Sequence, residues 1–159
     1  MKFFIIFIIY SIFSLPVFVN AENINPNNLE LCISDDVAKW NDCWGKDTNN
    51  LSSGLNDDGT NFFISYEGEF KSGKPEGVGS AVFVDGGSFV GIWENGYGTN
   101  GILKLPTQTG KFNIYEGEVR MVIPHGKGKF TFAEGEMSGQ TLEACWDMGN
   151  FSGFIGIDC

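Results

Sequence analysis

One phrase of alternating aromatic residues and glycines recurs along the second half of the chain. It is clearest in "YEGEFKSGKPEGVG" at residues 66–79, where glycines follow Tyr66 at offsets of two, seven, eleven and thirteen. Further copies begin at Phe89 and at Tyr115. Tandem copies of one short unit are typical of repeat proteins, in which each unit packs only on its neighbours. This repetition limits the possible folds more than any other feature of the sequence.

Three copies can be aligned, at about residues 66–88, 89–114 and 115–137. The third copy has Val122 where the first two have glycine, Gly101 of the second comes one place late, and a faint fourth copy starts near Met137. The repeated positions are Tyr66, Gly68, Phe70, Gly73, Gly77, Gly79 and Gly86, then Phe89, Gly91, Trp93 and Gly96, and then Tyr115, Gly117, Gly126, Gly128 and Gly135. We interpret these as structural repeat residues.

The pattern inside each copy indicates β-strands. Apolar and polar residues alternate in "SAVFVDGGSFVGIW" and "GKGKFTFAEGEMSG", and no apolar period of 3.6 residues appears beyond Tyr66. In a strand, Tyr66 and Gly68 point to the same face. An aromatic ring from the next strand can then cover the bare glycine backbone. We expect the chain to reverse at Gly73 and "KPEG", with Gly77 at positive φ.

The phrase resembles the MORN (membrane occupation and recognition nexus) repeat, in which Y-x-G-x-W-x-x-G-x-x-x-G-x-G is followed by a distal D/N-G. Residues 66–88 match this pattern closely, 115–137 well, and 89–114 in part. The resemblance implies an all-β fold, an elongated single-layer antiparallel sheet of stacked hairpins. We assign this sheet to residues 62–159, with a cysteine-containing cap at its C-terminal end.

The N-terminal 21 residues have the features of a secretory signal. Lys2 precedes an apolar run, and Val19 and Ala21 occupy the small-residue positions of a cleavage site. An uncleaved membrane anchor is the alternative. Cleavage leaves 9 basic residues (10 minus Lys2) against 20 acidic ones, a net charge of −11. Such an excess repels nucleic acid, and we expect a secreted or periplasmic protein.

All four cysteines lie beyond this segment, which favours two disulfides over free thiols. Short loops close at the least entropic cost, which favours Cys32–Cys43 and Cys145–Cys159. Zinc fits poorly because there is no C-x-x-C pair and a single histidine. Residues 22–61 then form a cysteine-containing cap and polar loop, with a short helix capped by Ser34 or Asp35.

No constellation of catalytic residues is apparent, and we expect no metal or cofactor. His125 in "PHGKGK" is interpreted as a turn residue, because MORN-like repeats often carry histidine there. A row of glutamates could serve a glycan hydrolase only if two carboxyl groups lined a cleft at about 5–9.5 Å. These glutamates are Glu67, Glu69, Glu116 and Glu118.

Three functions remain. The favoured hypothesis is a non-enzymatic scaffold that binds a protein, a surface component or another copy of itself. The alternative is lipid binding on the aromatic face, which the family name suggests and the negative charge opposes. An enzyme acting on glycans is third. The candidate binding face consists of Tyr66, Phe70, Phe89, Trp93 and Tyr115.

Overall fold

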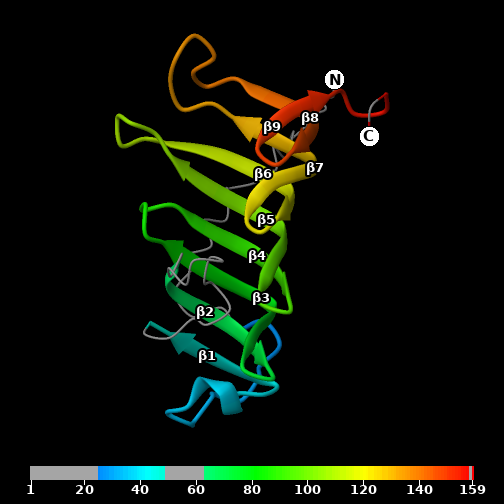
Figure 1. Cartoon of the computed structure of the whole chain (residues 1–159). Helices are drawn as coiled ribbons and strands as arrows, with labels where there is room; N and C mark the ends of the chain where they lie inside the picture. Colours follow the sequence, from blue (N-terminus) through cyan, green and yellow to red (C-terminus); the bar gives the residue numbers. More distant parts are fainter. Residues whose placement is uncertain (1–24, 49–62, 158) are drawn as a thin grey trace, which may run out of the picture.

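The computed structural model describes residues 25–48, 63–157 and 159, and shows one open antiparallel sheet of nine strands in sequence order (Figure 1). The expected signal segment and most of the polar loop lie outside these residues. No helix in the described part is long and apolar enough to cross a membrane. The strands are β1 (Cys43–Asp47), β2 (Phe63–Lys71), β3 (Lys74–Phe83), β4 (Ser88–Glu94), β5 (Tyr97–Pro106), β6 (Phe112–Arg120), β7 (Ile123–Thr131), β8 (Thr141–Asp147) and β9 (Asn150–Gly153).

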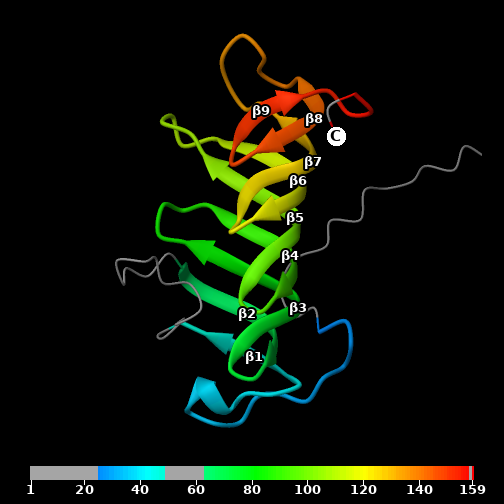
Figure 2. The same ribbon diagram turned by 45° about the vertical axis from the view of Figure 1, so that its right-hand side comes forward.

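The sheet is a stack of hairpins, as the repeats predict. Strands β2 and β3, β4 and β5, β6 and β7, and β8 and β9 pair in turn, each pair joined by two residues. Figures 1 and 2 show that the stack is elongated. The longer connections between successive hairpins project from the side opposite the two-residue turns. Each strand is hydrogen-bonded only to the strands next to it in sequence, which is the arrangement expected of a repeat protein.

Each hairpin turns through two residues with positive φ, the geometry that matches the twist of the flanking strands. The first turn is Ser72–Gly73, with φ of 51° and 74°. The prediction that "KPEG" forms this turn was wrong, because Pro75 lies inside β3. Gly77 does have positive φ, 64°, but it lies in β3 opposite an irregularity in β2.

A row of glycines crosses the sheet at right angles to the strands. Each member is the register partner of the next, and the row ends at Ala144 in β8. The glycines of the row are Gly45, Gly68, Gly79, Gly91, Gly101, Gly117 and Gly128. Gly101 is therefore the counterpart of Gly79. Between its two row glycines the middle hairpin has one residue fewer than the hairpins on either side, so Gly101 is not shifted to a later position.

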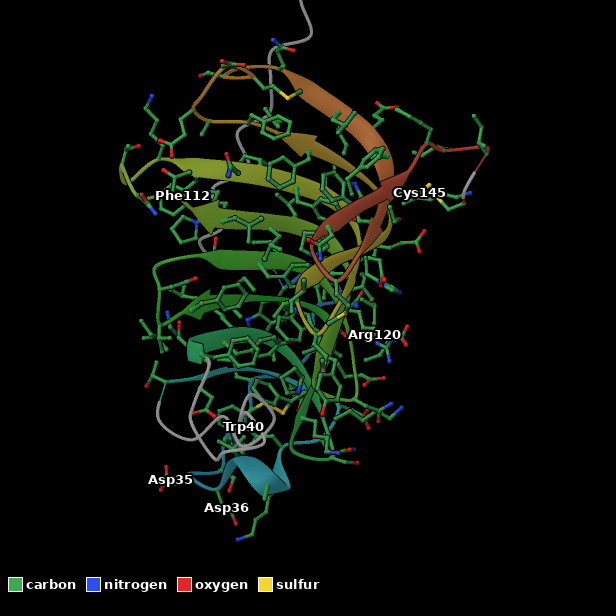
Figure 3. The ribbon with its side chains drawn as sticks, turned by 45° about the horizontal axis from the view of Figure 1, so that its top comes forward. Asp35, Asp36, Trp40, Phe112, Arg120 and Cys145 are labelled. Atoms are coloured by element: carbon green, nitrogen blue, oxygen red, sulfur yellow. A yellow bond between two sulfur atoms is a disulfide. The ribbon has the colours of Figure 1, made fainter. Side chains whose placement is uncertain are left out.

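The four hairpins share an irregularity beside this row. The register shifts between Gly68 and Phe70 in β2, and at the corresponding place in β4, β6 and β8. Bulges bend strands and increase their twist. The strands accordingly curve around one face, whose side chains gather inside the bend (Figure 3). This curvature lets a single sheet enclose a core without a second layer.

The register also identifies the fourth hairpin. Leu142, Ala144, Trp146 and Gly149 repeat the spacing of Tyr66, Gly68, Phe70 and Gly73, and Ala144 pairs with Gly128 as Gly91 pairs with Gly79. The fourth copy therefore begins at Leu142 and not near Met137. Sequence comparison missed it because the defining tyrosine and glycine are replaced by leucine and alanine.

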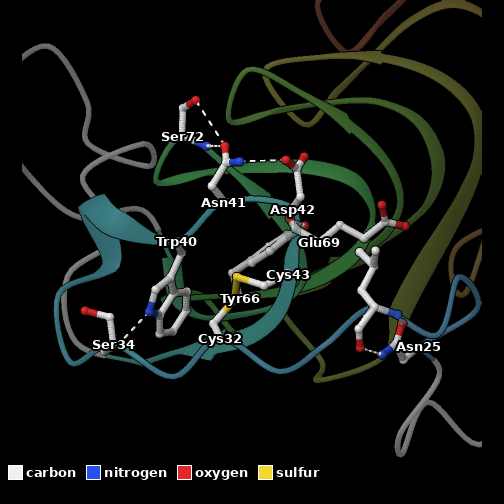
Figure 4. The surroundings of a disulfide bond; sticks show 11 residues. Asn25, Cys32, Ser34, Trp40, Asn41, Asp42, Cys43, Tyr66, Glu69 and Ser72 are labelled. Atoms are coloured by element: carbon white, nitrogen blue, oxygen red, sulfur yellow. Dashed lines mark hydrogen bonds between the residues drawn. A yellow bond between two sulfur atoms is a disulfide. The ribbon is translucent and has the colours of Figure 1, made fainter.

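Both ends of the sheet carry a disulfide. Cys32 is bonded to Cys43 at the start of β1, and Cys145 in β8 to Cys159. These are the expected pairs. The first holds the N-terminal segment around Trp40, whose indole donates to the Ser34 carbonyl at 2.7 Å (Figure 4). The expected helix is a short 3₁₀ turn, Val37–Lys39, capped by Asp36 rather than by Ser34 or Asp35.

Candidate functional site

The five rings expected to form a binding face are packed in the core. Tyr66, Phe70, Phe89, Trp93 and Tyr115 are each exposed by no more than 1%. Four of them continue a ladder of edge-to-face contacts that begins at Trp40, with centroids 4.7 to 5.3 Å apart. Such pairs add stability beyond area burial. These five rings therefore hold the fold together and offer no open surface to a ligand.

Rings cover glycines of their own strand and of the neighbouring strand of the same hairpin, so the expected cover from an adjacent strand is found where Tyr66 lies against Gly79 and Phe89 against Gly101. A Cβ added at Gly79 would lie 2.7 Å from Cε2 of Tyr66, and one at Gly91 would lie 2.8 Å from Cζ of Phe89. At the first end of the row, a Cβ at Gly45 would lie 2.6 Å from Cζ3 of Trp40. The glycines are required because the rings occupy the space of their missing side chains.

The polar atoms of the buried rings find backbone acceptors. Tyr66 donates to the carbonyl of Glu69 at 3.1 Å, and Tyr115 to that of Glu118 at 2.8 Å. Burial, followed by the charge of Glu69, raises the pKa of Tyr66 well above 10.0. Burial, followed by the charge of Glu118, raises the pKa of Tyr115 to about 12. Both hydroxyls are therefore neutral structural donors.

The ring ladder is interrupted in the third hairpin. Val119 stands where the other hairpins have Phe70, Trp93 and Trp146, and Val122 packs over Gly98. A hollow of about 370 Å³ lies beside this interruption and is lined by Tyr97, Val119, Arg120 and Met121 among others. The hollow is open and shallow, and we assign no ligand to it.

The glutamate row does not form a catalytic pair across strands. Glu67 and Glu116 lie on β2 and β6, which are four strand spacings apart, about 19 Å at 4.8 Å each. Glu67 instead pairs with Lys46 at 3.1 Å. The carboxylate of Glu69 accepts from Asn27 at 2.7 Å and from the amide of Val78 at 3.2 Å. These contacts give two members of the row structural roles.

His125 also differs from its expected place. It lies within β7, three residues beyond the Met121–Val122 turn, and its Nδ1 is 3.3 Å from an Asp147 oxygen. Within the described residues, no group of three or more histidine, cysteine, aspartate and glutamate side chains is placed to hold a metal ion.

The face of the sheet opposite the rings carries an exposed aliphatic patch that the sequence analysis did not single out. We call it the outer-face patch. Its members are Val82, Val90, Ile92 and Ile102 on β3, β4 and β5, which are 42 to 44% exposed. Val90 and Ile102 are register partners. The sequence does indicate a second apolar face, because "SAVFVDGGSFVGIW" has apolar residues at both alternating sets of positions. Only one of these sets is needed for the core.

The comparisons with known families agree with this architecture. The MORN repeat family matches residues 66–88 and 115–137, which are the first and third hairpins with their following connections. No curated protein matches the chain. A stack of two-residue hairpins over a shared ring ladder defines the class as a β-hairpin repeat protein. The matches show that the chain contains MORN repeats in its first and third hairpins.

Proposed function

We propose that this protein is an exported, non-enzymatic binding module that contacts another protein through the outer face of its sheet. MORN repeats are generally modules for interaction with proteins or membrane lipids. The observation that supports protein binding here is the outer-face patch. Large exposed apolar patches on soluble proteins are typical of interaction sites. The two disulfides favour an oxidising compartment, in agreement with the expected secretory signal.

The burial of the rings argues against the lipid alternative. An acyl chain would have to displace Tyr66, Phe89 or Tyr115 from contacts with the glycine row. Anionic headgroups would meet a chain whose full net charge is −10. The separation of Glu67 from Glu116 likewise argues against a hydrolase that pairs carboxylates across β2 and β6.

A paired capture experiment tests this function. The wild-type chain and a variant with Val90→Asp and Ile102→Asp would be immobilised and exposed to proteins from the compartment into which the chain is exported. Binding that the variant loses supports the outer face, provided that both chains have the same circular dichroism and melting temperature. Equal capture by both chains, or flotation of the wild-type chain with neutral liposomes, contradicts the proposal.

A further inference from the structure

The outer-face patch lies at the centre of a row of side chains that crosses the sheet on the face opposite the rings. Val90 of β4 and Ile102 of β5 form the middle of the row. Outward from the middle, Ser80 of β3 pairs with Val90, and Glu116 of β6 pairs with Ile102. The centre of the row is therefore apolar, and its flanks become polar on both sides.

The two ends of this row carry opposite charges in a definite order. Glu67 of β2 and then Lys46 of β1 follow Ser80 on one side. Lys129 of β7 and then Glu143 of β8 follow Glu116 on the other. From the centre outward, the side of the row on β3 to β1 has the acid Glu67 and then the base Lys46. The side on β6 to β8 has Lys129 between two acids, Glu116 and Glu143.

We propose that the outer face binds a second copy of this chain, face to face, about a two-fold axis parallel to the strands between β4 and β5. This proposal rests on the proposed binding function and names its partner. Such an axis brings β4 over β5 of the second copy, β2 over β7 and β1 over β8. Sheets pack face to face with their strands roughly aligned.

This axis produces complementary contacts along the row. Val90 meets Ile102 of the second copy, and Glu67 meets its Lys129. At the ends, Lys46 meets Glu143 of the second copy. Each contact occurs twice, because a two-fold interface is self-complementary. The other face-to-face axis, along the row, would place Glu67 on Glu67 and Lys46 on Lys46, and like charges disfavour it.

A second row supports the same axis. Beside the central row, Ile92 of β4 pairs with Asn100 of β5, and Asn100 pairs with Glu118 of β6. The same two-fold brings Glu69 of β2 over Lys127 of β7 in the second copy. Within the described part of the chain, neither Lys127 nor Lys129 has an ion pair within 4.0 Å, and both are exposed. These lysines are available to a second copy.

The test measures the molar mass of the oxidised protein, expressed from its complete gene into an oxidising compartment and purified from there. Light scattering and sedimentation should show a concentration-dependent dimer of the wild-type chain. Val90→Asp should abolish it. The matched control is Val84→Asp, because Val84 is 61% exposed but lies in the β3–β4 connection outside both rows. A monomer at all concentrations, or a dimer that survives Val90→Asp, overturns the proposal.

A charge exchange tests the geometry. Lys129→Glu should weaken dimerisation by about tenfold or more, and the additional change Glu67→Lys should restore most of the loss. Lys111→Glu alters the net charge equally but lies outside the rows, and it should leave the dimer unchanged. Failure of Glu67→Lys to rescue Lys129→Glu, in chains with wild-type circular dichroism, overturns the axis. A monomeric chain that still captures another protein through Val90 would overturn only the self-association and leave the proposed binding function standing.

Discussion

At the scale of single residues, the fold depends on the fit between each ring and the glycines beneath it. Tyr66 lies over Gly68 and Gly79, and Tyr115 lies over Gly117 and Gly128. Glycine inside a strand is unfavourable by about 0.5–1 kcal/mol relative to alanine. The packing of a buried ring offsets that cost, because an aromatic side chain contributes a large apolar area.

The first prediction concerns Gly79. Gly79→Ala should destabilise the protein by about 1–3 kcal/mol, because the added methyl overlaps the Tyr66 ring. The change should cost less when Tyr66→Leu is also present, because leucine lacks the ring atoms that the added methyl overlaps. A double-mutant cycle by denaturant unfolding measures the coupling, with about 1 kcal/mol expected. Additive costs would contradict the packing account.

The second prediction concerns alkaline pH. The pKa of Tyr115 is raised in the folded chain from 10.0 to about 12, and that of Tyr66 is also raised. The folded state therefore binds more protons than the unfolded state above pH 10, and stability falls as pH rises through this range. Each tyrosine should contribute a loss of about 1 kcal/mol between pH 10 and 11.

Denaturant midpoints measured from pH 8 to 11 test this pH dependence. Tyr115→Phe should remove about half of the loss, although it also removes the hydrogen bond to the carbonyl of Glu118. The comparison therefore uses the slope with pH and not the stability at one pH. An unchanged slope in Tyr115→Phe and in Tyr66→Phe would assign the pH dependence to other groups.

At the scale of elements, the hairpins differ mainly in their turns. Asn95–Gly96 has the residues that a turn with two positive φ angles prefers, whereas Met121–Val122 has neither. A β-branched residue at positive φ is an outlier. The Val122 side chain is nevertheless buried over Gly98, in the hairpin where Val119 replaces a ring. The third hairpin thus uses a strained turn residue to fill space that a ring fills elsewhere.

The third prediction tests this strain at the exposed turn position. Met121→Asn should stabilise the protein by about 0.5–1 kcal/mol, because asparagine tolerates the left-handed conformation and Met121 is 52% exposed. The reciprocal change, Asn95→Met at φ of 52°, should destabilise by a similar amount. Thermal unfolding of both variants measures the difference. Effects of the same sign would show that side-chain contacts, and not backbone conformation, decide these turns.

The sequence predicted the hairpin stack because Tyr66, Gly68 and Phe70 form a pattern that returns at fixed spacing. The disulfide pairs were predicted from loop length alone. The position of the first turn was not, because Pro75 and Gly77 are typical turn residues and only the register shows that they belong to a bulged strand. The five rings expected to form a binding face are buried in the core. Alternation separates the faces, but it does not tell which aromatic residues a curved sheet will enclose.

At the scale of the whole molecule, stability is carried from neighbour to neighbour along the stack. A strand such as β5 pairs with β4 and β6, and within the described residues no strand pairs with both ends of the sheet. The glycine row and the rings continue across these boundaries, so adjacent hairpins share one core. Of the two terminal strands, β9 pairs with β8 alone, whereas β1 pairs with β2 and is bridged on its other side by Leu31. A disulfide lies close to each of them. The disulfides therefore protect the places where the sheet would begin to open.

The fourth prediction concerns these two caps. Replacing Cys32 and Cys43 by serine should destabilise the protein by about 2–3 kcal/mol, as expected for a loop with a sequence separation of 11. Replacing Cys145 and Cys159 should have a similar effect at the other end, where the separation is 14. Denaturant unfolding of the two variants measures the total cost. Peptide mapping without reduction first establishes that the wild-type chain has both bonds and no free thiol.

Hydrogen exchange then shows which strands lose amide protection in each variant. Nearest-neighbour coupling predicts that the Cys32/Cys43 variant loses protection first in β1 and β2, and that the Cys145/Cys159 variant loses it first in β8 and β9. Strands β4 to β6 should keep their protection longest in both variants. A uniform loss across all nine strands would show that the sheet opens as a single unit. In that case the ring ladder couples the hairpins strongly enough to override the one-dimensional order of the stack.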